Sequence, residues 1–197
     1  MKYISHRKVV NTMLQPQHIT EYFINTYIKP GDTVADATAG NGHDTLKLCK
    51  AVGEGGKVYA FDIQKCALEE SEKLLSSMNC NNYILIEDSH SEMDKYIDTS
   101  LKAVIFNLGY LPGGDHSICT RHSTTIEAID KALALISDDG FISVTVYYGK
   151  NSGTEEKDKV MTYLENLNHK LCTVTVHDFF NRPNNPPLTV IITKNGI

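Results

Sequence analysis

The sequence lacks any apolar run that approaches the roughly 20 residues needed to span a bilayer. Its first ten residues also lack the apolar core and cleavage site of a signal peptide. We therefore expect a cytoplasmic protein with no membrane partner. The five cysteines are scattered and contain no C-x-x-C pair, so we expect reduced thiols that are mostly buried.

Positive charge is also scarce. The chain has 19 lysines and arginines against 24 aspartates and glutamates, a formal net charge of -5. This balance argues against a broad basic face for gripping long nucleic acid, but it leaves room for a local basic patch. Arginine binds phosphate better than lysine does, because its planar guanidinium can donate two parallel hydrogen bonds. It occurs three times, as Arg7, Arg121 and Arg182.

What is present is the composition of a globular protein, with 41% hydrophobic and 22% charged residues. A chain of 197 residues with no internal repeat or long linker is expected to form one domain over residues 1–197, with an N-terminal helical arm at about 1–30.

Strand and helix patterns alternate along the chain. We expect strands at 33–36, 57–62, 83–86, 101–106, 140–147, 172–178 and 188–193, and helices at 16–28, 44–52, 66–78, 123–135 and 154–167. Such alternation predicts an α/β protein with a mostly parallel sheet and helices on both faces. The last two strands have no helix between them, so they should pair antiparallel. A seven-stranded sheet with one terminal antiparallel strand is typical of the class I methyltransferase (Rossmann-like) fold.

A glycine-rich turn, 36–42, follows the first strand. Gly40 and Gly42 allow a ligand to approach the backbone closely. The third glycine of the dinucleotide-binding fingerprint is absent, so the helix that follows need not bind a pyrophosphate. S-adenosylmethionine (SAM) has no phosphate, and its cationic methionine moiety favours a nearby acid such as Asp36. The alternative is a tight turn with only a structural role.

Further acids lie at the ends of the next strands, where ligands of open α/β sheets bind. Asp62 can accept hydrogen bonds from both ribose hydroxyls, and Asp88 stands where the adenine amino group usually lies. His43 and His90 adjoin this pocket, and we expect packing or hydrogen-bonding roles for them. The residues expected to contact SAM are Asp36, Thr38, Gly40, Asn41, Gly42, Asp44, Asp62, Gln64, Asp88, Ser89 and Asn107.

The segment Asn107-Leu-Gly-Tyr110 resembles the Asn-Pro-Pro-Tyr motif of amino-group methyltransferases. In that motif the Asn side-chain oxygen and the next backbone carbonyl accept hydrogen bonds from the target amine, and the Tyr stacks on the base. The resemblance implies these roles for Asn107, the Leu108 carbonyl and Tyr110. Leu108 and Gly109 replace both prolines, which leaves the loop less rigid. A simple strand-to-loop exit is the alternative.

Methyl transfer is an in-line displacement that depends mainly on positioning. An alkyl amine, with a reference pKa of about 10.4, must first lose a proton, and Asp115 and His116 are the nearest candidate bases. Loop capping or substrate hydrogen bonding is the alternative for each. The spacing of His116, Cys119 and His122 could suggest a metal site, but no fourth ligand is apparent and we expect no metal.

The loop 181–187 combines an arginine with three asparagines and three prolines, which suggests a stiff polar wall for a substrate. Arg182 could reach a phosphate, and Arg121 and Arg7 could complete a small basic rim. Pairing of Arg121 with Glu127, and solvation of Arg7, are the alternatives. The residues expected to contact substrate or RNA are Arg7, Leu108, Gly109, Tyr110, Arg121, Arg182, Asn184 and Asn185.

Taken together, the segments 36–44, 107–116 and 181–187 resemble a bacterial family of tRNA 5-aminomethyl-2-thiouridine methyltransferases, formerly labelled "putative rRNA methylase". The resemblance covers nearly the whole chain. It implies SAM-dependent methylation of the aminomethyl nitrogen on the wobble uridine, giving 5-methylaminomethyl-2-thiouridine, with the tRNA anticodon loop held by the basic rim.

Two alternatives remain open in the sequence. One is a SAM-dependent methyltransferase that acts on rRNA or another amine. The other is a non-catalytic SAM-binding or RNA-binding module, against which the strand-end acids and the Asn-x-x-Tyr segment both argue. A homodimer is compatible with the fold, although no residue argues for one.

Overall fold

The computed structural model describes residues 14–111, 119–149 and 153–195. The strands are β1 (Thr33–Asp36), β2 (Lys57–Asp62), β3 (Tyr83–Glu87), β4 (Leu101–Leu108), β5 (Ile136–Val146), β6 (Cys172–His177) and β7 (Leu188–Lys194). The helices are α1 (Pro16–Tyr27), α2 (His43–Val52), α3 (Lys65–Ser77), α4 (His122–Leu135) and α5 (Thr154–Glu165), with a short 3-10 helix η1 (His90–Lys95). Every expected element is present, and most bounds agree within one or two residues.

The seven strands form one sheet in the order β3-β2-β1-β4-β5-β7-β6. Strands β1 to β5 pair in parallel, whereas β7 pairs antiparallel with both β5 and β6. The expected antiparallel pair at the end of the chain is thus confirmed. Because β7 runs against β5, the loop that precedes β7 lies at the same edge of the sheet as the carboxyl ends of β1 to β5.

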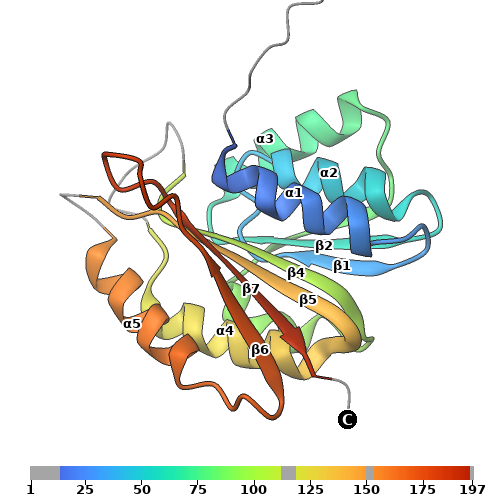
Figure 1. Ribbon diagram of the computed structural model, residues 1–197. Coiled ribbons are helices and arrows are strands. Elements are labelled where there is room, and N and C mark those ends of the chain that lie inside the picture. The colour runs from blue at the N-terminus through green and yellow to red at the C-terminus, as the bar shows by residue number, and fades with distance from the viewer. Residues whose placement is uncertain (1–13, 112–118, 150–152, 196–197) are drawn as a thin grey trace, which may run out of the picture.

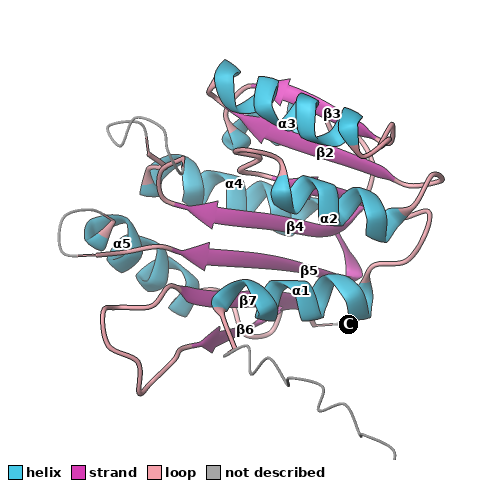
Figure 2. Ribbon diagram, turned by 90° about the horizontal axis from the view of Figure 1, so that it is seen from above, coloured by secondary structure: helices cyan, strands magenta, loops and turns pink. Residues whose placement is uncertain are grey.

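Helices cover both faces of the sheet (Figure 1, Figure 2). Helices α1, α2 and α3 lie on one face, and α4, α5 and η1 lie on the other. Each face has its own core of fully buried side chains, one that includes Phe106 and Ile129 and one that includes Leu48 and Phe141. A central strand covered on both faces is apolar where it is buried, which explains the hydrophobic run 103–106 within β4.

Two strands are longer than expected by more than one residue, and one element was not foreseen. Strand β4 continues through Leu108, so Asn107 belongs to the sheet rather than to a loop, and β5 begins at Ile136 instead of Gly140. The 3-10 helix η1 packs between β3 and α4. Within the described residues, no helix combines the length and hydropathy required to cross a bilayer.

The expectation that the cysteines are mostly buried is wrong. All five are unpaired, but only Cys49 and Cys172 are buried, whereas Cys66 and Cys119 are exposed and Cys80 is intermediate. Cys66 lies near the start of α3, and Cys119 lies in the segment that precedes α4, where it forms an isolated bridge with Tyr110. Burial raises the pKa of the Cys49 thiol to about 12, which makes that thiol unreactive at neutral pH.

Candidate functional site

The glycine turn has two positions with a left-handed backbone, and at one of them, Gly42, a side chain would also clash with α3. Gly40 and Gly42 have φ angles of +51° and +81°, in the left-handed region. A Cβ atom on Gly42 would lie 2.9 Å from the Cα atom of Ser71 on α3. The Ser71 hydroxyl donates a 2.8 Å hydrogen bond to the Gly40 carbonyl, so the turn is fixed to α3, and Asn41 is held half-buried between the two glycines.

Asp36 organises this turn from inside the protein. Its side chain is fully buried, and its carboxylate accepts hydrogen bonds from the Thr38 N–H at 3.1 Å and the Thr45 hydroxyl at 2.7 Å. Burial, aided by the nearby charge of Asp44, raises the pKa of Asp36 to about 7. The structure therefore places Asp36 beneath the turn rather than at its surface, where direct contact with a cofactor was expected.

Asp62, at the end of β2, is the acid that reaches the surface of this site. One carboxylate oxygen accepts the Gly40 N–H and the other accepts the Gln64 N–H, both at 2.9 Å. Burial raises the pKa of Asp62, while these two N–H bonds oppose the shift. Each oxygen retains capacity for a further hydrogen bond. The neighbouring side chain of Ile63 is 59% exposed and provides an apolar surface beside the carboxylate.

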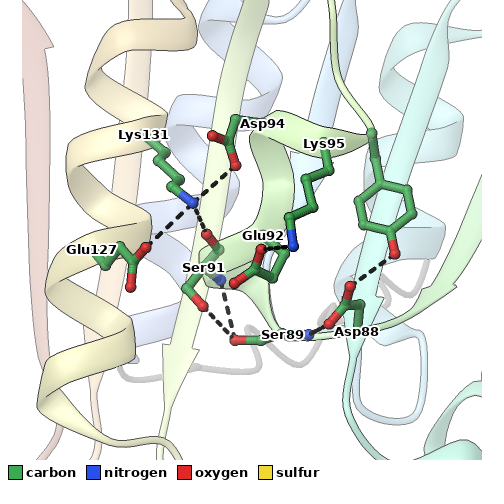
Figure 3. Close-up of polar contacts among 9 residues, drawn as sticks. Asp88, Ser89, Ser91, Glu92, Asp94, Lys95, Glu127 and Lys131 are labelled. Carbon is green, nitrogen blue, oxygen red and sulfur yellow. Dashed lines mark hydrogen bonds and ion pairs between the residues drawn. The ribbon is translucent and has the colours of Figure 1, made fainter.

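The end of β3 forms the next wall (Figure 3). The Asp88 carboxylate accepts a 2.8 Å hydrogen bond from the Tyr96 hydroxyl, which holds the pKa of Asp88 below its usual value. The Ser89 hydroxyl caps η1 by accepting from the Ser91 N–H at 3.2 Å. Lys131 of α4 joins η1 to α4 through an ion pair with Asp94 at 2.9 Å and a hydrogen bond to the Ser91 carbonyl.

His90 packs beneath this wall, as expected. The ring is 9% exposed, its Nδ1 lies 3.1 Å from the Ala37 carbonyl, and it meets the Phe106 ring edge-on. Burial lowers the pKa of His90, so the imidazole is neutral at physiological pH. His43 is instead exposed at the start of α2.

Asn107 is fixed by two segments distant in sequence. Its backbone N–H donates to the Thr38 hydroxyl at 2.7 Å, and its side-chain NH₂ donates to the Asp44 carboxylate at 2.9 Å. Lys47 pairs with the other oxygen of Asp44 at 2.8 Å. Because the carboxylate takes the NH₂ group, the amide oxygen of Asn107 is the end left to accept a hydrogen bond.

The residues after Asn107 differ from the expected geometry in one respect. The Leu108 carbonyl accepts the Tyr147 N–H at 3.1 Å, so one of its two acceptor positions takes part in sheet pairing. This follows from the extra length of β4. Gly109 has a φ angle of +148°, and Tyr110, which is 43% exposed, bridges to Cys119.

A pocket of about 570 Å³ opens just after the carboxyl ends of β4 and β5, and its lining begins at Gly109, two residues after Asn107. Three tyrosines line it, Tyr110, Tyr147 and Tyr148, together with Arg121 and Asn185. The sequence argument missed Tyr147, Tyr148 and the pocket acid Glu156. The strand-end rule that identified Asp62 also applies to the end of β5 and would have indicated the two tyrosines.

The 178–187 loop forms part of the pocket wall, and its tip is exposed. The Arg182 guanidinium stacks on the Phe179 ring at 4.3 Å, while Phe180 is 97% exposed. Asn184 and Asn185 adopt left-handed φ angles of +66° and +48°, which asparagine tolerates better than most residues.

The remaining predicted residues divide into two groups. Arg121 is exposed at the N-terminal cap of α4, and it has no ion pair among the described residues, since Glu127 pairs with Lys131 at 3.3 Å. Asp115, His116 and Arg7 lie outside the described residues. Within the described ranges no group of three or more His, Cys, Asp or Glu side chains could hold a metal ion.

Comparison with known proteins agrees with this geometry. Residues 58–193 match the family described as "Putative rRNA methylase". The chain is 38% identical, over 180 residues, to the chloroplastic tRNA (mnm(5)s(2)U34)-methyltransferase of Arabidopsis thaliana. That alignment covers 86% of this chain and 66% of the plant protein, so the chain spans slightly less than two thirds of its relative.

Solved structures of bacterial proteins are also similar. A "putative rRNA-methylase" from Clostridium thermocellum is 47% identical with a TM-score of 0.91, over 93% of this chain and 100% of that one. A "putative methyltransferase" from Streptococcus mutans, determined in complex with SAH, is 36% identical with a TM-score of 0.85, over 93% and 99% of the two chains. With its seven-stranded sheet and strand-end site, the chain therefore belongs to the "Putative rRNA methylase" family of SAM-dependent methyltransferases.

Proposed function

We propose that the protein methylates the aminomethyl nitrogen of 5-aminomethyl-2-thiouridine at the wobble position of tRNA, giving 5-methylaminomethyl-2-thiouridine. The observation that carries this proposal is the Asn107–Asp44 hydrogen bond of 2.9 Å, which leaves the Asn107 amide oxygen as an acceptor two residues before Gly109, where a tyrosine-lined pocket begins. The named activity of the plant relative supports an aminomethyl uridine as the substrate.

The strand-end residues suit SAM better than a nucleotide phosphate. The Gly40 N–H, which would face a phosphate in a dinucleotide site, is directed at Asp62. Three carboxylates surround the turn, Asp36, Asp44 and Asp62, and Lys47 is the cation paired with them in the described residues. Such a site favours a positively charged ligand. When bound, SAM supplies the methyl group from a cationic sulfur.

We assign the cofactor contacts by position. Asp62 accepts from the ribose hydroxyls, Ile63 packs against the adenine ring, and Asp88 or Ser89 contacts the adenine amino group. The turn residues Thr38, Asn41 and Asp44 adjoin the methionine part, while Asp36, Gly40, Gly42 and Gln64 shape the turn that holds it.

The acceptor residues orient the amine. The Asn107 amide oxygen accepts an N–H of the acceptor, which directs the nitrogen lone pair toward the methyl group, and most of the rate gain comes from this alignment. Tyr110 stacks on the base, with Tyr147 and Tyr148 enclosing it. A bound alkylammonium must lose a proton before it reacts, and Asp115 and His116 remain the proposed bases.

The test is mass spectrometry of nucleosides from separately purified tRNA and rRNA, in a gene-deletion strain and its parent. The proposal requires the deletion strain to lose 5-methylaminomethyl-2-thiouridine and to accumulate the unmethylated amine. Loss of an rRNA nucleoside with unchanged tRNA would instead match the description of the family and would refute a tRNA acceptor. No change in either RNA would refute both.

A further inference from the structure

Glu156 is a buried carboxylate that lines the acceptor pocket and has no role in the function described so far. It lies in the first turn of α5 and is 8% exposed. Among the described residues, no lysine or arginine forms an ion pair with it. A buried carboxylate is costly unless its oxygens are well hydrogen-bonded, so the partners of Glu156 indicate what it does.

Both of its oxygens accept hydrogen bonds from threonine hydroxyls. Thr125 on α4 donates to Oε1 at 3.0 Å, and Thr120 donates to Oε2 at 2.7 Å. The Thr120 hydroxyl in turn accepts the Gly109 N–H at 2.9 Å, and the Thr120 N–H donates to the Gly109 carbonyl at 2.9 Å. A continuous chain of bonds therefore runs from α5 through Thr120 to the residue two positions after Asn107.

Gly109 is one of the two positions at which the acceptor segment departs from Asn-Pro-Pro-Tyr. A glycine with φ of +148° adds backbone freedom where a proline would remove it. The Thr120 hydroxyl needs an acceptor for its own hydrogen if it is to remain in place for the Gly109 N–H. Glu156 provides that acceptor from a separate helix.

We propose that Glu156 is a positioning residue for methyl transfer, which acts through Thr120 to hold Gly109 and hence the geometry of Asn107 and Tyr110. The proposal rests on the proposed function, because it takes the pocket to be the acceptor site. Burial raises the pKa of Glu156 and the two hydroxyl donors oppose that shift, so the bonds favour the ionised form. Hydrogen bonding rather than charge is what the loop requires.

The test compares Glu156→Gln with Glu156→Ala, and Thr120→Ser with Thr120→Val. Serine keeps the hydroxyl at position 120, and glutamine keeps one acceptor oxygen for the Thr120 hydroxyl while its NH₂ donates to the Thr125 hydroxyl, so both variants should keep kcat within about threefold. Alanine and valine break the chain, and kcat should fall by roughly 10- to 100-fold, as expected for a misplaced reacting group. Affinity for SAH, measured by calorimetry, should stay within about threefold. Thr124→Val is the matched control, because its hydroxyl bonds only the Arg121 carbonyl.

Two outcomes would overturn the proposal. If Glu156→Gln loses as much activity as Glu156→Ala, or abolishes a limb of the pH profile of kcat/KM, the carboxylate acts through its charge or as a base. If Glu156→Ala and Thr120→Val retain wild-type kcat, the chain of bonds does not support catalysis.

Amide hydrogen exchange separates this proposal from the function on which it rests. The Gly109 amide should exchange faster in Glu156→Ala and Thr120→Val than in the wild type, whatever the substrate, and unchanged protection would refute the positioning role. If the wild-type protein does not methylate tRNA, only the tRNA assignment fails, and the exchange rates still decide whether Glu156 holds the loop.

Discussion

Asp44 is the residue that decides which end of the Asn107 amide is left to accept a hydrogen bond. Its carboxylate holds the Asn107 NH₂ on one side and Lys47 on the other. Under the proposed function, an amide rotated by half a turn would present its NH₂ instead of its oxygen to the acceptor nitrogen, and an N–H donor cannot align a lone pair.

The first prediction concerns this pair. We expect Asn107→Ala to abolish detectable turnover, and Asp44→Ala to lower kcat by roughly 10- to 100-fold, because the amide loses its fixed orientation. SAH affinity should remain within several-fold in Asn107→Ala. Single-turnover methylation and SAH calorimetry measure these effects, with Lys47→Met as the control that removes the other partner of Asp44. Normal methylation by Asn107→Ala would disprove the amine-alignment mechanism.

Asp62 provides the second prediction at this scale. Asp62→Ala should weaken SAH binding by an amount that corresponds to roughly 1.5–3 kcal/mol, because hydrogen bonds to a charged acceptor are lost. The Gly40 N–H would also lose its partner, so Asp62→Asn, which keeps one acceptor oxygen, should be less severe. Calorimetry with SAH measures both variants. An unaltered affinity in Asp62→Ala would remove Asp62 from the cofactor site.

The third prediction follows from the burial of Asp36. Its folded-state pKa of about 7 lies above the value of about 3.9 for an exposed aspartate, so the folded protein binds this proton more tightly than the unfolded chain does. The resulting stabilisation is complete below about pH 4 and is lost as the pH rises toward 7. Urea unfolding at pH 5, 6, 7 and 8 should show a steeper loss of stability in the wild type than in Asp36→Asn. Parallel curves would mean that Asp36 does not titrate in this range.

At the residue scale, the sequence located the strand-end acids but not their roles. Asp36 and Asp62 look alike in the pattern, since each ends a strand, and only packing makes the first a buried support and the second a surface acceptor. The sequence did not indicate a role for Glu156, because a glutamate in the first turn of a helix is expected from its favourable interaction with the helix dipole alone.

At the scale of elements, the strands were predictable because buried strands have continuous apolar sequences. Strand β2 agrees with its expected range, 57–62, residue for residue. The 3-10 helix η1 was not predictable, because six residues of mixed polarity carry neither a helical nor a strand period. The start of β5 at Ile136 was also missed, since Ser137-Asp-Asp139 reads as a turn.

The loop between β6 and β7 provides the fourth prediction. Phe180 is almost fully exposed, and it follows Phe179, on whose ring the Arg182 guanidinium stacks. Exposed aromatic rings and guanidinium planes are suited to stacking with unpaired bases. Phe180→Ala should raise KM for tRNA by roughly 5- to 100-fold, given about 1–3 kcal/mol per stacked base, with SAH affinity unchanged. Arg182→Ala should have a similar effect.

Leu171→Ala is the control for this prediction. Leu171 is 57% exposed, but it precedes β6 and therefore lies at the opposite edge of the sheet. Initial rates at varied tRNA concentration measure KM for each variant. If Phe180→Ala and Leu171→Ala give the same KM as the wild type, the loop does not contact the RNA.

At the scale of the whole molecule, an acidic protein that binds RNA must do so through few phosphate contacts. If the three arginines are its phosphate contacts, the slope of log K against log salt concentration should be about -2 for a single-stranded loop. We therefore expect about a 15-fold loss of tRNA affinity between 50 and 200 mM salt, against the roughly 10³- to 10⁵-fold loss of a protein with six to ten contacts. Fluorescence anisotropy with an anticodon stem-loop measures the slope, and a value near -6 would indicate a much larger basic surface.

The place of β7 in the sheet has a consequence for synthesis on the ribosome. Strand β6 leaves the ribosome before β7, yet its neighbour in the sheet is β7, which also covers the outer edge of β5. A nascent chain that has not yet exposed residues 188–194 therefore presents two unpaired strand edges, which are sites for aggregation. The glycine turn and the parallel strands β1 to β5 around it can form earlier, so this part of the sheet can fold before β7 arrives.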